Sequence, residues 1–278
     1  MRYLFVLLIA GFCAAEPVIH PGGAQPLLDQ GYRQMYDLQF ADAHNTFHQF
    51  EREHPADPMG PASDAAAYLF SEFDRLHILQ SEFFTHDQHF ITDHKLTPDP
   101  ALKQQFDAAL DRAQALAAKS PEDKNSQFAS ILANGLRSNY MALIEKRYAA
   151  ALSEMKSGRA AAEKLLAADP TFYDAWLAVG VENYMLSIKS APVRFFLRLS
   201  GAETNRETGI AKLKLTAEKG HYLAPFAKLL LGVAAMRDHD TRTAGNILTE
   251  LARTYPNNPL YRQELARLDP MASRSMDN

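Results

Sequence analysis

This sequence predicts an all-α fold, and three observations support that prediction. About one residue in six is alanine, the strongest helix former, whereas valine and isoleucine, which favour strands, are scarce. No alternating polar and apolar run of useful length appears. Apolar residues instead recur at helical spacing in successive segments that are separated by proline, which cannot continue a helix.

The overall composition is that of a globular protein. Of the 278 residues, 47% are hydrophobic and 22% are charged, which is too apolar for a disordered chain and too charged for a multi-span membrane protein. The formal net charge is -4. A general nucleic-acid binder needs a basic surface, so we expect no nucleic-acid partner.

The first fifteen residues have the three parts of a secretory signal peptide. Arg2 precedes an apolar run over 3–12, and Cys13 and Ala15 supply small residues for cleavage after position 15. The run is too short to span a bilayer as a helix. Phe12 before Cys13 disfavours lipidation of this cysteine, the single one in the chain. We therefore expect an exported protein, periplasmic, cell-envelope associated or secreted, whose mature chain has no cysteine.

The mature chain is predicted to be a succession of helices. Residues 16–25, with two prolines and two glycines, are expected to form a flexible leader. Residues 86–100 are predicted as a polar linker and 269–278 as a loose tail, and 257–268 would cap the stack. The other predicted helices are 26–38, 41–53, 61–84, 101–119, 123–143, 148–168, 172–187, 206–218, 224–237 and 241–254.

A five-point pattern occurs near both ends of the chain. Its spacing of 12, 4, 3 and 5 residues connects Gly31, Ala43, Phe47, Phe50 and Pro55. The same spacing connects Gly232, Ala244, Leu248, Leu251 and Pro256. Small residues allow two antiparallel helices to cross closely, the bulky ones share one face of the second helix, and proline ends that helix. The pattern therefore predicts repeated helix pairs.

A partial third copy follows Pro170, where Trp176, Val179, Gly180 and Tyr184 have the spacing of a first helix. Together the three segments resemble the tetratricopeptide repeat, a helix-turn-helix unit of about 34 residues. The resemblance implies an α-solenoid of antiparallel helix pairs, a right-handed superhelix over 26–268. The helix-ending prolines are irregularly spaced, so some repeats are expected to be degenerate or lengthened.

The segment 169–259 also resembles a group of exported bacterial tetratricopeptide-repeat proteins. That group carries a Gly-Asp-Arg-x-x-Gly turn, at which this chain has Thr204-Asn205-Arg206-Glu207-Thr208-Gly209. This chain has Thr204 and Asn205 in place of the first glycine and the aspartate, whereas the ending 255–261 fits the group.

The resemblance also implies a site, because the first helix of each repeat in this family lines a concave groove that binds partners. Counting from Gly31, Gly180 and Gly232, the partner-binding residues would be Tyr32, Met35, Tyr36, Leu177, Val181, Tyr184, Met185, Val233, Met236 and Arg237. The alternative is that some of them pack against adjacent helices. We expect an exported scaffold that binds a protein or peptide, without catalysis and without a cofactor.

Histidine is concentrated between His44 and His94, which hold seven of the ten. His44 and His48 are four residues apart, a spacing that metal sites use on helices. They follow Ala43 and Phe47, which the repeat directs inward, so we expect both imidazoles on the solvated side and no metal site. No nucleophile elbow, phosphate-binding loop or dinucleotide fingerprint is present. A histidine-dependent metal protein or enzyme remains an alternative.

The segment 189–199 mixes apolar residues with Lys189, Arg194 and Arg198. Such a mixture suits a membrane interface, and a peripheral membrane protein is the other alternative function. We favour packing of Phe195 and Phe196 into the core, because helical sequence resumes directly afterwards.

Overall fold

The structure of this protein, a computed structural model, describes residues 26–79 and 96–275, with side chains described as far as residue 268. These ranges hold twelve α-helices and no strand. The helices are α1 (Pro26–Tyr36), α2 (Phe40–Glu53), α3 (Met59–Arg75), α6 (Pro100–Ala117), α7 (Lys124–Asn139), α8 (Tyr148–Ala168), α9 (Trp176–Ser187), α10 (Ala191–Leu199), α11 (Arg206–Lys219), α12 (Ala224–Arg237), α13 (Thr241–Thr254) and α14 (Pro259–Ser275).

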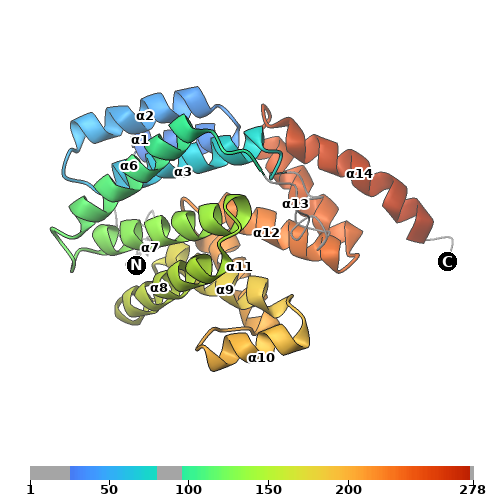
Figure 1. Ribbon diagram of the computed structural model, residues 1–278. Coiled ribbons are helices and arrows are strands. Elements are labelled where there is room, and N and C mark those ends of the chain that lie inside the picture. The colour runs from blue at the N-terminus through green and yellow to red at the C-terminus, as the bar shows by residue number, and fades with distance from the viewer. Residues whose placement is uncertain (1–25, 80–95, 276–278) are drawn as a thin grey trace, which may run out of the picture.

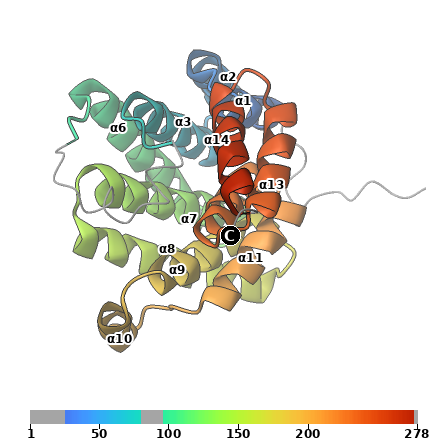
Figure 2. The ribbon, with the colours of Figure 1, turned by 90° about the vertical axis from the view of Figure 1, so that its right-hand side faces the viewer.

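The all-α prediction is confirmed for the described residues. Each helix packs against the next one along the chain, except that α11 packs against α9 and α10 stands to one side (Figures 1 and 2). Sequence reasoning placed most helices within a few residues of their observed bounds. Among the described helices, none has both the length and the hydropathy needed to cross a bilayer.

One type of turn ends several helices. Leu38, His77 and His239 have φ near +58° to +59°, and each follows the last residues of a helix. In each case the next residue donates its N–H to a carbonyl five positions back: Gln39 to Gln34, Ile78 to Phe73, and Asp240 to Ala235. This is the Schellman turn, which satisfies carbonyls that the helix leaves unpaired.

The two segments that share the five-point pattern also share their local structure. Ala43 in α2 and Ala244 in α13 occupy the same place in the pattern, and counted from them the two helices begin and end at the same positions. The same type of turn precedes each helix.

 The pattern's buried positions are Ala43, Phe47, Phe50, Ala244, Leu248 and Leu251, each at most 2% exposed. Gly31 and Gly232 are both buried against the second helix of their own pair, more tightly at Gly31. A Cβ on Gly31 would lie 2.2 Å from the ring of Phe47, and one on Gly232 would lie 3.5 Å from Ile247.

The first helix also contacts the end of the chain. Asp37, directly after α1, accepts hydrogen bonds from the backbone N–H groups of Asn257 (2.8 Å) and Asn258 (3.2 Å). The side-chain amide of Asn257 donates to the other oxygen of Asp37 at 2.7 Å. In Figure 1, α1 lies at the upper left and α14 at the upper right, and in Figure 2 the two helices lie near each other. The chain therefore bends so that the end of α1 meets the turn that precedes α14.

Some expectations differ from the structure. The helix predicted over 61–84 ends at Arg75, because His77 adopts the left-handed turn described above. The last helix was expected to stop at 268 before a loose tail, whereas α14 continues to Ser275. The signal peptide and leader (1–25) and most of the linker predicted over 86–100 lie outside the described residues.

The prediction that 191–199 packs into the core is wrong. This segment forms α10, which has no buried residue. Its apolar side chains are among the most exposed of the described large hydrophobics: Val193 (46%), Phe195 (59%), Phe196 (69%) and Leu199 (70%). The backbone of α10 contacts α9 weakly and lies at the outer edge of the molecule in both views (Figures 1 and 2).

Candidate functional site

An apolar hollow lies between helices that are far apart in the sequence. It has a volume of about 810 Å³, part of it open to solvent. Its wall is formed mainly by aliphatic and aromatic side chains of α1, α3, α7, α9 and α12, among them Met35, Phe70, Leu132, Leu177 and Phe226. A lining of this kind is typical of binding sites for apolar groups.

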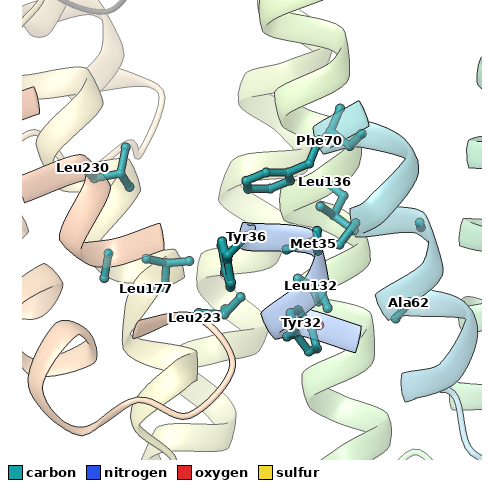
Figure 3. Packing of buried hydrophobic residues seen from close by; sticks show 14 of the residues in the cluster. Tyr32, Met35, Tyr36, Ala62, Phe70, Leu132, Leu136, Leu177, Leu223 and Leu230 are labelled. Carbon is teal, nitrogen blue, oxygen red and sulfur yellow. The ribbon is translucent and has the colours of Figure 1, made fainter. Parts of the chain in front are cut away.

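The helix α1 supplies the aromatic wall of this hollow. Figure 3 shows Tyr36 and Met35 between Leu177 on one side and Leu136 on the other. The hydroxyl of Tyr36 donates to the carbonyl of Tyr222 at 3.0 Å. The ring of Tyr32 stacks on that of Tyr222 with a centroid distance of 4.8 Å. These contacts fix α1 against the segment that leads into α12.

Burial controls the protonation of these tyrosines. Loss of solvent raises the pKa of both Tyr32 and Tyr36 well above the ordinary value, although a hydrogen bond from Ser63 opposes the shift at Tyr32. Both hydroxyls therefore stay protonated at neutral pH. At Tyr32 the hydroxyl accepts from Ser63 Oγ at 3.1 Å, deep in the core.

Asp174 is the acidic residue in the wall of the hollow, and its carboxylate is already engaged. It accepts the backbone N–H groups of His221 (2.9 Å), Tyr222 (3.1 Å) and Leu223 (3.0 Å). Burial raises the pKa of Asp174, and these three donors act in the opposite direction. Since its oxygens hold the start of α12, Asp174 positions the wall and leaves the surface of the hollow apolar.

A second, smaller hollow adjoins the first. It has a volume of about 590 Å³ and shares Met35, Tyr36 and Phe70 with its neighbour. Its remaining wall comes largely from α12 and from the start of α14, including Val233, Met236 and Tyr261. The aromatic side chains of α1 and α3 thus separate two apolar spaces.

The structure brings seven of the ten predicted partner-binding residues to these two hollows. Five line the larger one: Tyr32, Met35, Tyr36, Leu177 and Val181. Met35 and Tyr36 also line the smaller one, together with Val233 and Met236. Most of these side chains are buried, so they face an interior space rather than an open groove. The bending of the chain, which brings α12 against α1, is the physical reason.

The other three predicted residues line neither hollow. Tyr184 is 1% exposed and packs between α9 and α11. Met185 is half-buried against the core, and Arg237 is half-buried at the end of α12. All three predicted residues on α1 therefore line a hollow, as do two of the four on α9 and two of the three on α12.

The expected outward orientation of the two helical histidines is wrong for His44. Its side chain is 18% exposed, and Nδ1 lies 2.6 Å from Oδ1 of Asp64 on α3. The side chain of His48 is 42% exposed, and its Nε2 lies 3.1 Å from the other oxygen of Asp64. Sequence reasoning missed Asp64 because an acidic residue among alanines gives no signal of which helix it faces. His86, His89 and His94 lie outside the described residues.

A scan of protein-family models, a search of curated proteins and a search of solved structures each found no match for this chain.

Proposed function

We propose that this chain is a non-catalytic binding protein that accepts apolar side chains of a protein or peptide partner in its larger hollow. The observation that carries the proposal is a hollow whose lining is mainly apolar and whose buried polar groups are engaged within the chain. Tyr36 and Asp174 are bonded to the backbone at 221–223, and Ser138 Oγ donates to the carbonyl of Ala151 at 2.8 Å. Recognition would therefore come from burial of apolar surface.

The resemblance to tetratricopeptide repeats supports the same function. Three hairpins, α1–α2, α7–α8 and α12–α13, are joined by turns with a positive-φ residue: Leu38, Lys146 and His239. We infer a solenoid of the tetratricopeptide type that is bent into a closed form, with α10 inserted between α9 and α11. On this proposal the partner meets the helix faces that the family uses, and the signal peptide predicted at 1–15 would place the encounter outside the cytoplasm.

Gly135 on α7 provides the test, because it lines the larger hollow and a Cβ there would meet no atom of the described residues within 4 Å. Peptides that bind the full-length chain would be selected from a random display library, and their affinities measured by calorimetry. We expect the selected peptides to be rich in apolar residues. Gly135→Trp should weaken their binding at least ten-fold, because the indole would occupy the space that the peptide side chains need.

Gly245→Trp is the matched control. Gly245 lies inside α13, a Cβ there also meets nothing within 4 Å, and the residue lines neither hollow. This variant should bind the selected peptides as the unmodified chain does. The proposal would be contradicted if the Gly135→Trp variant bound the selected peptides with the affinity of the unmodified chain. It would also be contradicted if the unmodified chain bound fatty acids but no peptide.

A second candidate function is docking on an anionic membrane surface through α10. The exposed side chains of Phe195, Phe196 and Leu199 form an apolar face with no cover from the described residues, and Arg194 and Arg198 lie on the same short helix. Apolar side chains enter the acyl boundary and basic side chains pair with anionic headgroups. Nine residues supply weak anchoring, so binding should be reversible.

Flotation with phosphatidylglycerol-containing vesicles tests this second function. The full-length chain should float with these vesicles and not with pure phosphatidylcholine. Phe195→Ser combined with Phe196→Ser should abolish flotation without lowering the melting temperature. Tyr148→Ser changes an aromatic side chain of similar exposure (53%) on α8 and should float normally. A chain that stays at the bottom of the gradient with both vesicles would refute membrane docking.

A further inference from the structure

Four side chains with metal-binding chemistry converge where α2 packs on α3. His44, His48 and Glu51 lie on α2, at positions separated by four and three residues, and therefore share one face of that helix. Asp64 lies on α3 opposite them. Its oxygens are 2.6 Å from His44 Nδ1 and 3.1 Å from His48 Nε2.

A cation beside Asp64 would offset the cost of burying its carboxylate. The residue is 0% exposed and is surrounded on α3 by buried alanines. An ionised carboxylate removed from water is costly unless it is paired or bound to a metal. Within the described residues, the ion-pair partners of Asp64 are the two imidazoles, and an imidazole carries a charge only when it is protonated. A divalent cation would supply that charge with the histidines neutral.

Glu51 adds a second carboxylate, and its position depends on a glycine. A Cβ on Gly60, near the start of α3, would lie 2.7 Å from Cγ of Glu51, so the absence of that Cβ lets the glutamate lie against α3. Oε1 of Glu51 is buried and has no hydrogen-bond partner among the described residues. Oε2 lies 3.5 Å from Arg112. A bound cation would give this buried carboxylate oxygen the partner that it lacks.

We propose that His48, Glu51 and Asp64 bind one divalent transition-metal ion of the zinc class, with His44 positioning Asp64. One ligand atom from each of the three residues lies within 4.8 Å of the others. Tetrahedral zinc, with bonds of about 2.0–2.2 Å, needs separations of about 3.4 Å, so small side-chain rotations complete the site. The imidazole favours zinc over magnesium or calcium, which prefer oxygen ligands alone.

His44 acts through Asp64 in this proposal. A hydrogen bond from the imidazole to one carboxylate oxygen fixes the orientation of the other, as outer partners of metal ligands commonly do. The ring of His44 is itself held by Tyr68, whose ring centroid is 4.0 Å away. Three protein ligands leave a fourth position for water, an arrangement that is compatible with binding of a further molecule at the metal.

The test is calorimetric titration of the full-length, tag-free chain with zinc chloride after treatment with a chelator. We expect saturable binding of one ion per chain with micromolar or higher affinity. His48→Ala removes a ligand whose side chain is 42% exposed, so the fold should survive, and zinc affinity should fall at least ten-fold. His44→Ala should lower the affinity by about ten- to a hundred-fold, the range for outer-shell partners.

Two controls separate this site from the other histidines. His54→Ala changes an exposed histidine directly after the same helix and should leave zinc affinity unchanged. Combined replacement of His86, His89 and His94 by alanine should also leave it unchanged. Gly60→Ala should weaken zinc binding by displacing Glu51, and circular dichroism would establish that each variant remains helical.

X-ray absorption of the zinc-loaded chain supplies a readout that needs no variant. The expected spectrum shows one imidazole and otherwise oxygen ligands at about 2.0–2.2 Å. Absence of saturable binding, unchanged affinity of His48→Ala, or a spectrum with several imidazoles would each overturn the proposal. The last result would assign zinc to the other histidines, and unchanged His48→Ala affinity would leave the Asp64 cluster as a histidine–carboxylate ion pair.

Discussion

At the scale of single residues, Gly209 controls how closely α9 and α11 approach each other. A Cβ on Gly209 would lie 2.6 Å from the backbone nitrogen of Tyr184 and 2.9 Å from its Cα. Because these are backbone atoms, no side-chain rotation relieves the contact. On the partner helix, a Cβ on Gly180 would lie 3.0 Å from the backbone nitrogen of Leu213. The two glycines allow one close helix–helix contact beside the inserted α10.

Gly209→Ala should lower the free energy of unfolding by about 1–3 kcal/mol, the usual cost of overpacking a close contact. Gly135→Ala and Gly245→Ala are controls in the interiors of other helices, where a Cβ meets no atom within 4 Å. They should raise stability by up to about 1 kcal/mol through helix propensity. Urea unfolding of the three variants measures both effects, and an equal gain at Gly209 would contradict the assigned contact.

Asp169 makes the stability of the fold depend on pH, and its hydrogen-bond partners determine the direction of that dependence. Hydrogen bonds from Lys124 Nζ (2.7 Å) and from the Thr171 hydroxyl (2.6 Å) lower the pKa of this carboxyl below its ordinary value of 3.8. A folded-state pKa below the unfolded one stabilises the fold above about pH 4, and this contribution disappears as the pH falls through the folded value.

Asp169→Asn should therefore be less stable than the unmodified chain at pH 6. The difference in free energy of unfolding should shrink as the pH is lowered towards 2. Chemical unfolding at a series of pH values measures the difference. A gap that stays constant over this range would show that Asp169 contributes no proton-linked stability.

At the scale of secondary-structure elements, the helix-ending turns use residues that are poorly suited to them. Leu38, His77, Lys146 and His239 all have positive φ, a region that costs a residue with a Cβ about 1 kcal/mol or more. Glycine is the usual residue at this position. The turns form because they satisfy helix carbonyls and let the next helix fold back as its partner.

His239→Gly should raise the free energy of unfolding by about 0.5–1 kcal/mol, because glycine removes the left-handed strain at an exposed position. His54→Gly is the matched control. This histidine directly follows α2 with φ of -129°, so glycine gains nothing there and should destabilise the chain. Thermal unfolding of both variants gives the comparison, and a loss of stability at position 239 would be inconsistent with the turn.

At the scale of the whole molecule, contacts between distant segments of the chain bring together helices that line the hollows. Asp37 binds Asn257 and Asn258, more than two hundred residues away, and Tyr36 donates to the carbonyl of Tyr222. These contacts hold α1 against the start of α14 and against the segment that leads into α12, and both α1 and α12 line the two apolar spaces. A stack of helix pairs without this closure would present the same side chains on an open face.

Asp37→Ala should destabilise the chain by about 2–4 kcal/mol, because a buried carboxylate is removed and its donors at 257 and 258 lose their acceptor. Hydrogen exchange should become faster in α1 and at the start of α14 together. Asp42→Ala, at an exposed position on α2, should change neither by much. Faster hydrogen exchange confined to α1 would show that α1 and the start of α14 are not coupled.

The sequence predicted the helices well because their signals are local. Ala43, Phe47 and Phe50 share a helix face by their spacing alone, and Pro55 marks where that helix has to end. The exposure of α10 has no comparable local signal in the sequence. Its aromatic residues have the composition of a core segment, and only packing shows that no described helix covers them. The same holds for Asp64, whose histidine partners lie on another helix.

Amino-acid sequence by itself determined the helical class, most helix bounds and the equivalence of the hairpins at 31–55 and 232–256. Each of these depends on residues within a few turns of one another, where propensity and periodicity act. Tertiary structure alone decided that the predicted partner-binding faces enclose hollows, that α10 is exposed, and that His44 and His48 meet Asp64. Those outcomes depend on which distant side chains fit together in space, and spacing along the chain does not encode that fit.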